Sequence, residues 1–303
     1  MDFSLLIDLG QSALRMSTPL LLGGLGCLFA QWAGVWDIGI EGKMLFGCFF
    51  GILVSHFSQS AWLGVAGAVT AGLLLGLLMA VFIVSFKADQ IIVGVAVNIF
   101  SFGLTTFLLL TILGVKGSFG PDGVVSLPLI ESSAPKGIPI LYPLLFGYSP
   151  LVYLAWVLVI LSSVLLYRTS FGLGLRAVGE HPQTAEAAGI SVSRKQYWGL
   201  AIAGGLSGLA GAQLTLGFLP IFSENMTAGR GFIAFSAVIL GAGHPVKVFL
   251  AALMFGMTEA LGMALQSANM PVHFPLMVPY VVTIFVLVLF QLRRRAVGKG
   301  SRS

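Results

Sequence analysis

Two acidic residues lie four positions apart in the stretch VWDIGIEGKM, which connects two apolar segments. Asp37 and Glu41 would share one face of an α-helix, but Gly39 and Gly42 favour an unwound or broken segment instead. Irregular backbone at membrane depth persists only where protein or a water-filled cavity surrounds it. Two interpretations stay open: the acids belong to a pathway or gate, or they form an interfacial cap in which they meet Lys43.

Further polar residues lie inside or beside apolar segments, where an unpaired polar group is costly. Asn98 lies about two turns into the segment after KADQ, and it either joins two helices or contacts a solute. The stretch FSENMTAGRGF contains Arg230, which could pair with Glu224 or belong to a capped loop, and Glu259 needs a partner within its own apolar segment. The candidate pathway residues are Asp37, Glu41, Asn98, Glu224 and Asn225, and we expect no catalytic residue and no metal site.

A polar stretch, VGEHPQTAEAAGISVSRKQ, occupies residues 178–196. Pro182 suits the first turn of a helix because its missing N–H would be unpaired there, and Gly189 suits the position just after the end. The QTAEAA between them makes fewer than two turns, so other structure must hold this helix in place. Its alanines would let a partner surface approach closely. A docking helix for another protein and a self-packed surface loop are the two interpretations.

These residues belong to a strongly apolar chain. Of its 303 residues, 57% are hydrophobic and 9% are charged, whereas soluble domains carry about 25% charged residues. The composition predicts an integral membrane protein with one domain over residues 1–303. No basic residue precedes Arg15, so we expect no cleavable signal peptide. Cys27 and Cys48 lie in apolar surroundings and are expected to be small buried hydrophobes.

The apolar segments predict the fold class, which is all-α. A helix needs about 20 apolar residues to cross a bilayer, and this criterion favours a polytopic membrane protein with about nine transmembrane helices. The second and seventh segments are short and could be broken or re-entrant, and residues 3–10 are expected at the membrane surface. The segments lie near residues 11–32, 44–57, 61–86, 90–113, 151–167, 197–218, 231–243, 247–266 and 274–292.

Basic residues predict the orientation of these segments in the membrane. The tail 293–303 has five basic residues and no acidic one, so we place it in the cytoplasm together with loop 168–196. Loop 114–149 is then periplasmic or extracellular. Four spans precede that loop, one span follows it, and four more follow loop 168–196. The two four-helix halves therefore have opposite orientations, which is the layout of an inverted repeat.

Small residues recur every fourth position in two of the segments. Such spacing lets helix backbones approach closely in lipid, and tight packing is the expected role. One series is Gly64, Ala68, Gly72, Gly76 and Ala80, and the other is Gly204, Gly208 and Ala212.

Four motifs carry a resemblance to a known family. GLGLRAVGEHPQTAEAAGISV resembles the cytoplasmic coupling loop of permease subunits of ABC importers. DIGIEGKMLFG, ENMTAGRGFIAFSAVILG and PLMVPYVVTIFVLVL resemble signatures of the branched-chain amino acid, ribose and nucleoside group, in the same order, over about residues 15–292. Within that group, the four motifs are most similar to those of nucleoside permeases. Asp37 stands where asparagine is usual in that group, so the substrate is the least constrained part of the resemblance.

The resemblance implies a permease subunit of an ATP-driven importer, in a bacterial or archaeal inner membrane. Its implied partners are an ATPase subunit, a second permease (a related chain or a second copy), and an external substrate-binding protein for which loop 114–149 is a candidate surface. The bilayer is its environment, and no nucleic acid partner is expected. A nucleoside is the first expected solute, and a pentose or other simple sugar is the alternative. Coupling to the ATPase is assigned to Glu180, His181, Pro182, Thr184, Ala185, Glu186, Ala187, Ala188 and Gly189.

The chain has no G-x-x-x-x-G-K-[ST] phosphate loop, so ATP is expected on the partner subunit and no cofactor on this chain.

Two other functions compete with the importer permease, namely an intramembrane protease and an autonomous transporter. GLSG matches the G-x-S-G of rhomboid proteases, but Ser207 would need a histidine at membrane depth, and neither His244 nor His273 is clearly placed there. An autonomous channel or secondary transporter fits the inverted layout, but it would not need a docking helix.

Overall fold

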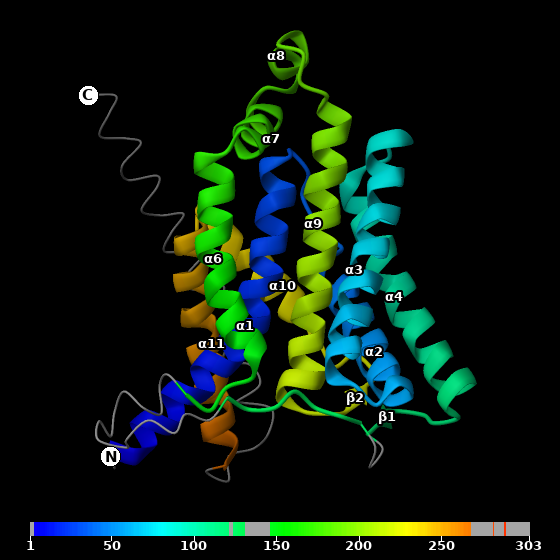
Figure 1. The fold of residues 1–303 in the computed structure, drawn as a ribbon, viewed down its shortest axis with the longest axis vertical. Coiled ribbons are helices and arrows are strands. Elements are labelled where there is room, and N and C mark those ends of the chain that lie inside the picture. Colours follow the sequence, from blue (N-terminus) through cyan, green and yellow to red (C-terminus); the bar gives the residue numbers. More distant parts are fainter. Residues whose placement is uncertain (1–2, 121–123, 131–145, 268–280, 282–287, 289–303) are drawn as a thin grey trace.

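The computed structural model describes residues 3–120, 124–130, 146–267, 281 and 288, and within them the protein is a bundle of helices (Figure 1). Seven helices in this part of the chain are long and apolar enough to cross a membrane, which agrees with the predicted polytopic membrane protein. They are α1 (Phe3–Trp32), α2 (Ile40–Ser58), α3 (Ala61–Ala80) with the π-helix η1 (Val81–Ser85), α4 (Gln90–Leu113), α6 (Pro150–Arg168), α9 (Val192–Ala212) with the π-helix η2 (Gln213–Phe218), and α11 (Pro245–Ser267).

The all-α prediction is confirmed, and three details of the predicted spans differ. α2 is one continuous 19-residue helix and is not broken; it begins earlier than expected because its charged residues Glu41 and Lys43 both find partners. The seventh segment is α10 (Arg230–Leu240), a helix of 11 residues. Residues 3–10 are the start of α1 rather than a separate segment. The ninth segment, 274–292, lies outside the described residues except for 281 and 288, so the count of nine stays a prediction.

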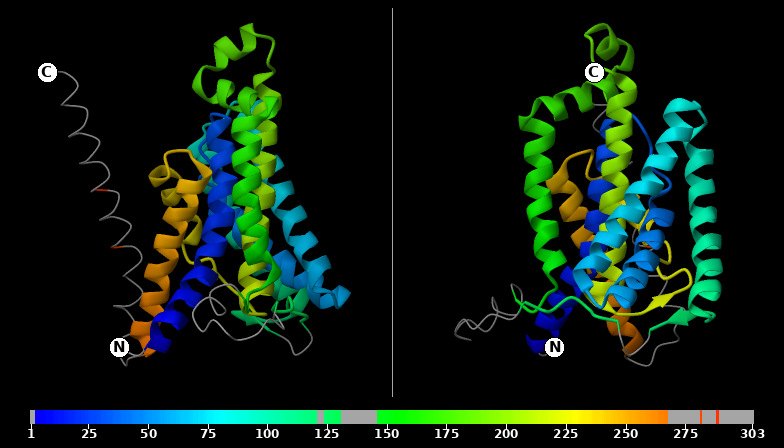
Figure 2. Two further views of the ribbon diagram at one scale, coloured as in Figure 1. Left: turned by 60° about the vertical axis from the view of Figure 1, so that its left-hand side comes forward. Right: turned by 45° about the vertical axis from the view of Figure 1, so that its right-hand side comes forward.

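α1 and α9 form the centre of the bundle and run in opposite directions (Figures 1 and 2). In their most apolar windows, 89% of α1 and 83% of the α9–η2 helix are buried, against 28% of α4. α2 and α3 pack on α9, whereas α10 and α11 pack on α1. The outer helices α3, α4 and α6 therefore present apolar surface to the lipid.

Close glycine contacts hold α2 and α3 against α9. A Cβ atom added at Gly72 would lie 2.7 Å from the Gly208 Cα, and one at Gly76 would lie 2.9 Å from the Gly204 Cα. Gly47 of α2 meets the same Gly208, at 2.7 Å from its Cα. These separations leave no room for a side chain, so the predicted role of the small-residue series in tight packing is confirmed.

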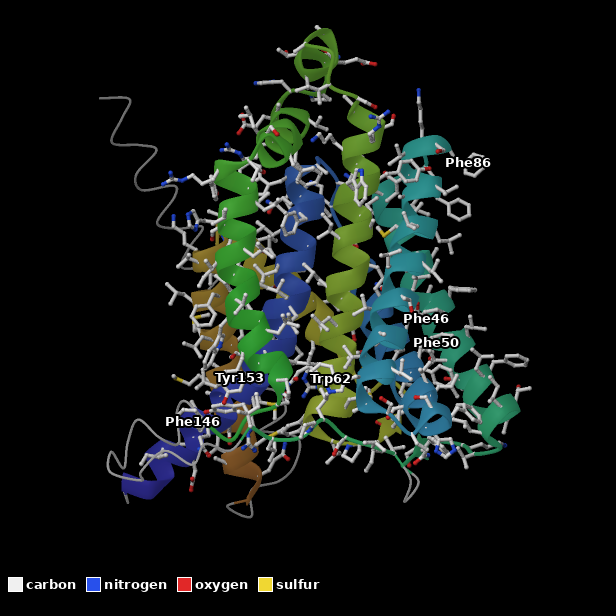
Figure 3. The ribbon with its side chains drawn as sticks, viewed as in Figure 1. Phe46, Phe50, Trp62, Phe86, Phe146 and Tyr153 are labelled. Carbon is white, nitrogen blue, oxygen red and sulfur yellow. The ribbon has the colours of Figure 1, made fainter. Side chains whose placement is uncertain are left out.

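The two ends of the bundle differ. At the α8 end lie α7 (Ser170–Glu180) and the projecting α8 (Pro182–Ala187). At the opposite strand end, β1 (Ser118–Phe119) pairs antiparallel with β2 (Phe222–Ser223). Exposed aromatic rings lie toward both ends of the α3–η1 helix, with Phe86 near the α8 end and Trp62 closer to the strand end (Figure 3). Such rings favour the two membrane–water interfaces.

Two helix–break–helix units run in opposite directions. α1 runs toward the α8 end, turns through residues 33–39 (the α1–α2 break), and α2 returns toward the strand end (Figure 1). α9 and η2 run toward the strand end, the chain turns through residues 219–229, and α10 returns toward the α8 end (Figure 2). This is the arrangement that an inverted repeat requires.

Candidate transport and coupling sites

The α1–α2 break is built around a buried ion pair. Lys43 donates to the Asp37 carboxylate, and both side chains are fully buried. The other carboxylate oxygen of Asp37 has no hydrogen-bond partner among the described residues. The chain can fold back here because Gly34 takes a positive φ of 78°, a conformation that glycine adopts without steric cost. Of the two interpretations of the acids, the contact with Lys43 holds for Asp37 alone.

Glu41 joins the first turn of α2 to the start of α10. Its Oε1 accepts a hydrogen bond from the Gly229 N–H at 2.7 Å, and its Oε2 accepts one from the Gly231 N–H at 2.6 Å. The first N–H groups of a helix lack partners within the helix, and a carboxylate there also meets the favourable end of the helix dipole. Glu41 is therefore the cap of a helix that begins about 190 residues later.

Asn98 of α4 ties this helix to the α1–α2 break. Its side-chain oxygen accepts from the Gly42 N–H at 2.7 Å, and its side-chain nitrogen donates to the Ile38 carbonyl at 2.9 Å. Asn98 therefore joins two segments, which was one of the two interpretations of this residue. Contact with a solute in another conformation stays a prediction.

Glu224 and Asn225 lie in the turn between η2 and α10, and Glu41 bonds to Gly229 at the end of that turn. The Glu224 carboxylate accepts from the Gly117 N–H at 3.1 Å. Asn225 has a positive φ of 56° in the turn before α10. Arg230 pairs with Glu259 at 3.2 Å and not with Glu224, so Glu259 has its partner. A pathway role for the five candidate residues stays a prediction.

A cavity that the sequence analysis does not predict lies between the two halves, next to Ser223 and Met226. Its volume is about 190 Å³. Pro19 lies within α1, and its missing N–H leaves the Arg15 carbonyl without its usual helical donor. A spatial grouping of this kind could not be seen in the sequence because its members come from α1, η2, β2, α10 and the turn between η2 and α10: Arg15, Met16, Pro19, Gln213, Leu214, Phe218, Leu219, Ser223, Met226 and Arg230.

The short helix predicted in the polar stretch is present. α8 has Pro182 in its first turn, and Gly189 follows its end with a φ of 79°. The Ile190 N–H bonds to the Ala185 carbonyl at 3.0 Å, and Ala185 is the one buried residue of α8. The remaining residues of the predicted coupling set, from Glu186 to Gly189, are exposed, so α8 presents a small, smooth surface outside the bundle.

α7 connects α8 to the α1–α2 break, and the sequence did not predict it as a helix. A Cβ at Gly179 would clash with the Trp32 carbonyl and lie 3.3 Å from the Gly34 nitrogen. The Trp32 indole in turn donates to the Gly243 carbonyl at 2.8 Å. The end of α7 is therefore packed directly on the backbone where α1 ends.

The described residues contain neither a metal site nor an activated serine. No group of His, Cys, Asp or Glu in that part of the chain could hold a metal ion. Ser207 is fully buried and its hydroxyl has no partner there. His244 stacks on Tyr167 at 5.2 Å, in the α10–α11 turn, so it does not bond to Ser207, and His273 lies outside the described residues.

Comparison with known proteins identifies the family of this chain. A family model described as branched-chain amino acid transport system / permease component matches residues 11–287. The chain belongs to this permease family. Members of it are components of transport systems and are not themselves enzymes, which confirms both the resemblance and the expectation of a non-enzyme.

Several curated relatives cover most of the chain. The guanosine ABC transporter permease protein NupQ of Bacillus subtilis is 34% identical over 92% of this permease and 90% of its own length. The nucleoside ABC transporter permease protein NupC of Lactococcus lactis is 33% identical over 90% and 89%. The putative glucose ABC transporter permease protein TsgC13 of Haloferax volcanii is 33% identical over 86% and 78%. No solved structure matches the chain.

Proposed function

We propose that this chain is a permease subunit of an ATP-driven importer, and that its solute is a nucleoside. The observation that carries the substrate is the similarity, over about nine-tenths of the chain, to permeases named for guanosine and for nucleosides. A glucose permease of similar identity supports the alternative, a simple sugar. ATP hydrolysis then belongs to a separate subunit, and this chain forms half of the membrane path with a second permease or a second copy of itself.

The α8 end faces the cytoplasm in this proposal, and α8 inserts into the ATPase. Basic residues gather there, as the orientation rule for cytoplasmic segments requires: Arg168, Arg176, Arg194 and Lys195. The strand end, with loop 114–149, receives the external substrate-binding protein.

The contacts suggest how the ATPase could move the path. α8 and α7 form one unit, and α7 ends against Trp32 and Gly34 at the α1–α2 break. The break carries the Asp37–Lys43 pair into the start of α2, and Glu41 transmits its position to α10. Closure of the ATPase on α8 would therefore shift the starts of α2 and α10 together, and alternating access needs such a concerted movement.

A binding screen of the partner substrate-binding protein tests the solute. A ligand that binds only the folded protein raises the melting temperature, so nucleosides, free bases, pentoses and hexoses are compared by thermal shift. We expect a shift with nucleosides alone. A shift with a sugar alone would replace the solute and keep the importer.

A double substitution in α8 tests the coupling. Glu186→Arg with Ala187→Trp adds bulk and reverses a charge on the exposed side of α8, and we expect loss of uptake and of ATPase association with the membrane fold retained. Glu186→Gln with Ala187→Ser is the matched control. Unchanged uptake in the bulky variant would show that α8 is not the contact.

A further inference from the structure

A groove of about 320 Å³ lies between α3 and α9 near the α8 end of the bundle. The two helices pack side by side (Figure 1). None of the residues that line the groove belongs to the candidate pathway or to the predicted coupling set, so the groove is separate from both. The lining residues are Leu73 and Leu77 of α3, and Arg194, Tyr197, Trp198 and Ala201 of α9.

The groove changes from basic to apolar along its length. Arg194 lies in the first turn of α9 at the α8 end, and Ala201 lies about 10 Å deeper along the helix. α3 runs in the opposite direction, so Leu77 lies nearer the α8 end and Leu73 lies one turn deeper. The outer end of the groove therefore carries a positive charge, and its inner end is formed by hydrocarbon side chains.

Small residues keep the inner end of the groove open. Ala201 contributes only a methyl group. One turn deeper, a Cβ added at Gly205 would lie 3.8 Å from the nearest atom, on Val69, which is ordinary van der Waals contact. The neighbouring Gly204 faces Gly72 and leaves no room for a Cβ. α3 and α9 are thus packed at backbone distance on one side and leave the groove on the other.

Basic side chains gather at the outer end without an acidic partner. Arg194 is exposed, and neither ion pair of the described residues involves it. Ser85 at the end of η1 shares a hydrogen bond of 2.6 Å with the Tyr197 hydroxyl, and the exposed Lys87 follows two residues later. Asp89, the next acid in the sequence, does not line the groove, and one of its oxygens accepts two N–H groups at the start of α4.

Aromatic rings place the outer end of the groove at the membrane boundary. Trp198 is 53% exposed and lies one turn deeper than Arg194. Trp and Tyr side chains favour the level of the lipid headgroups, where one end of the ring is apolar and the other is wet. Phe86, which follows Ser85, is exposed near the same end of the α3–η1 helix (Figure 3). The groove therefore extends from the headgroup level into the hydrocarbon.

We propose that this groove binds one anionic phospholipid, with the phosphate against Arg194 and one acyl chain between Leu73, Leu77 and Ala201. The charge of the headgroup complements the unpaired guanidinium, and an acyl chain needs no hydrogen-bond partner at the inner end, where a polar solute would lose its own. A helix of a second permease is about 10 Å across, and a single turn of it would need more than the volume of this groove.

The bound lipid would connect two elements that otherwise meet at this end through one side-chain hydrogen bond, between Ser85 and Tyr197. Its headgroup would lie between the end of the α3–η1 helix and the start of α9, and its chain would fill the space beside Ala201. Anionic lipid should therefore stabilise the fold, because a ligand that binds only the folded protein raises its melting temperature.

Brominated lipids test the site, because bromine on an acyl chain quenches tryptophan fluorescence on contact. The purified full-length permease is reconstituted in phosphatidylcholine vesicles with increasing fractions of brominated phosphatidylglycerol or brominated phosphatidylcholine. The signal of Trp198 is the difference between the unaltered chain and Trp198→Phe. Phosphatidylglycerol should quench this signal at about fivefold lower fractions than phosphatidylcholine, which is the preference expected from one base near a membrane surface.

Arg194→Gln should remove this preference, and Ala201→Leu, which fills the inner end, should reduce quenching by both lipids. Arg168→Gln is the matched control, because Arg168 is an exposed base at the α8 end that does not line the groove; it should leave the preference unchanged. An equal loss in Arg168→Gln would mean attraction by the general surface charge and would overturn the site, as would an unchanged preference in Arg194→Gln.

The oligomeric state separates the lipid from a second permease. Quenching of Trp198 by neither lipid, together with a dimer that Ala201→Leu dissociates in size-exclusion chromatography, would assign the groove to a subunit contact and overturn the proposal. Because Arg194→Gln changes only an exposed side chain, it tests the site even where Ala201→Leu fails to fold. No solute, ATPase or binding protein enters these measurements, so either result leaves the proposed transport function as it stands.

Discussion

At the scale of single residues, the interior of this permease depends on charges that meet far from water. The side chains of Lys43 and Asp37 are both fully buried, and each is the other's ion-pair partner. Removing one partner of a buried pair costs about 3–5 kcal/mol, because the remaining charge stays buried, whereas removing both costs much less. The pair is thus a strict requirement on two positions together.

A double-mutant cycle tests that requirement. Lys43→Met should strongly lower the melting temperature of the purified permease, since Asp37 is left without its cation. Asp37→Asn with Lys43→Met should recover much of the loss, because no buried charge remains. Thermal unfolding in detergent measures both. Equal melting temperatures for the single and the double variant would contradict the pairing.

Glu41 makes a second prediction at this scale. In Glu41→Gln one of the two oxygen acceptors becomes a donor, so one amide of the Gly229–Gly231 turn loses its partner. An unsatisfied buried donor costs about 1–3 kcal/mol, and we expect a loss of thermal stability of that size. The control is Glu224→Gln, whose carboxylate accepts one N–H at the strand end and whose loss should cost less. A smaller effect at position 41 than at 224 would refute the capping role.

At the scale of elements, α7 is the connection between the projecting helix and the interior. Gly179→Ala places a methyl group against the Trp32 carbonyl, so α7 must move away from the break. Variants along a coupling route change coupling by about 0.5–2 kcal/mol, which is about 2- to 30-fold in rate. We expect uptake per ATP hydrolysed to fall while the ATPase remains bound.

The matched control for that variant is Gly103→Ala on α4. A Cβ there meets nothing within 4 Å, so uptake and ATP hydrolysis should stay as in the unaltered importer. Normal coupling in Gly179→Ala would mean that α8 acts through another route, such as the α8–α9 connection.

At the scale of the whole molecule, the bundle is held at backbone distance. Gly208 of α9 packs against both α2 and α3, and a Cβ added at Gly208 would lie 3.2 Å from the Gly72 Cα. Overpacking of a core typically costs about 1–3 kcal/mol, and a leucine would press on the α3 backbone at Ala68 and Gly72. We expect Gly208→Leu to abolish the monodisperse folded peak in size-exclusion chromatography, and Gly103→Leu to leave it intact.

The sequence predicted the contacts that are periodic or local, and it did not predict those that join distant segments. The four-residue spacing of glycines indicated the packing of α3, and Pro182 with Gly189 marked α8, because each signal lies within one helix. Lys43 was a named partner for Asp37, which is six residues away. The cap that Glu41 provides for α10 and the Arg230–Glu259 pair depend on how the two halves fold together, and a single chain carries no local mark of that.

The Glu41 cap also has a consequence for biosynthesis. The acceptor belongs to the first half of the chain and leaves the ribosome well before the amides of Gly229 and Gly231 that need it. The Glu41 carboxylate is therefore already in the membrane when α10 is made, and it can accept the first N–H groups of α10 at once. If the gene were divided between α6 and α9, the N-terminal fragment would act as a template for the C-terminal one, and the reverse order of synthesis would leave α10 without a beginning.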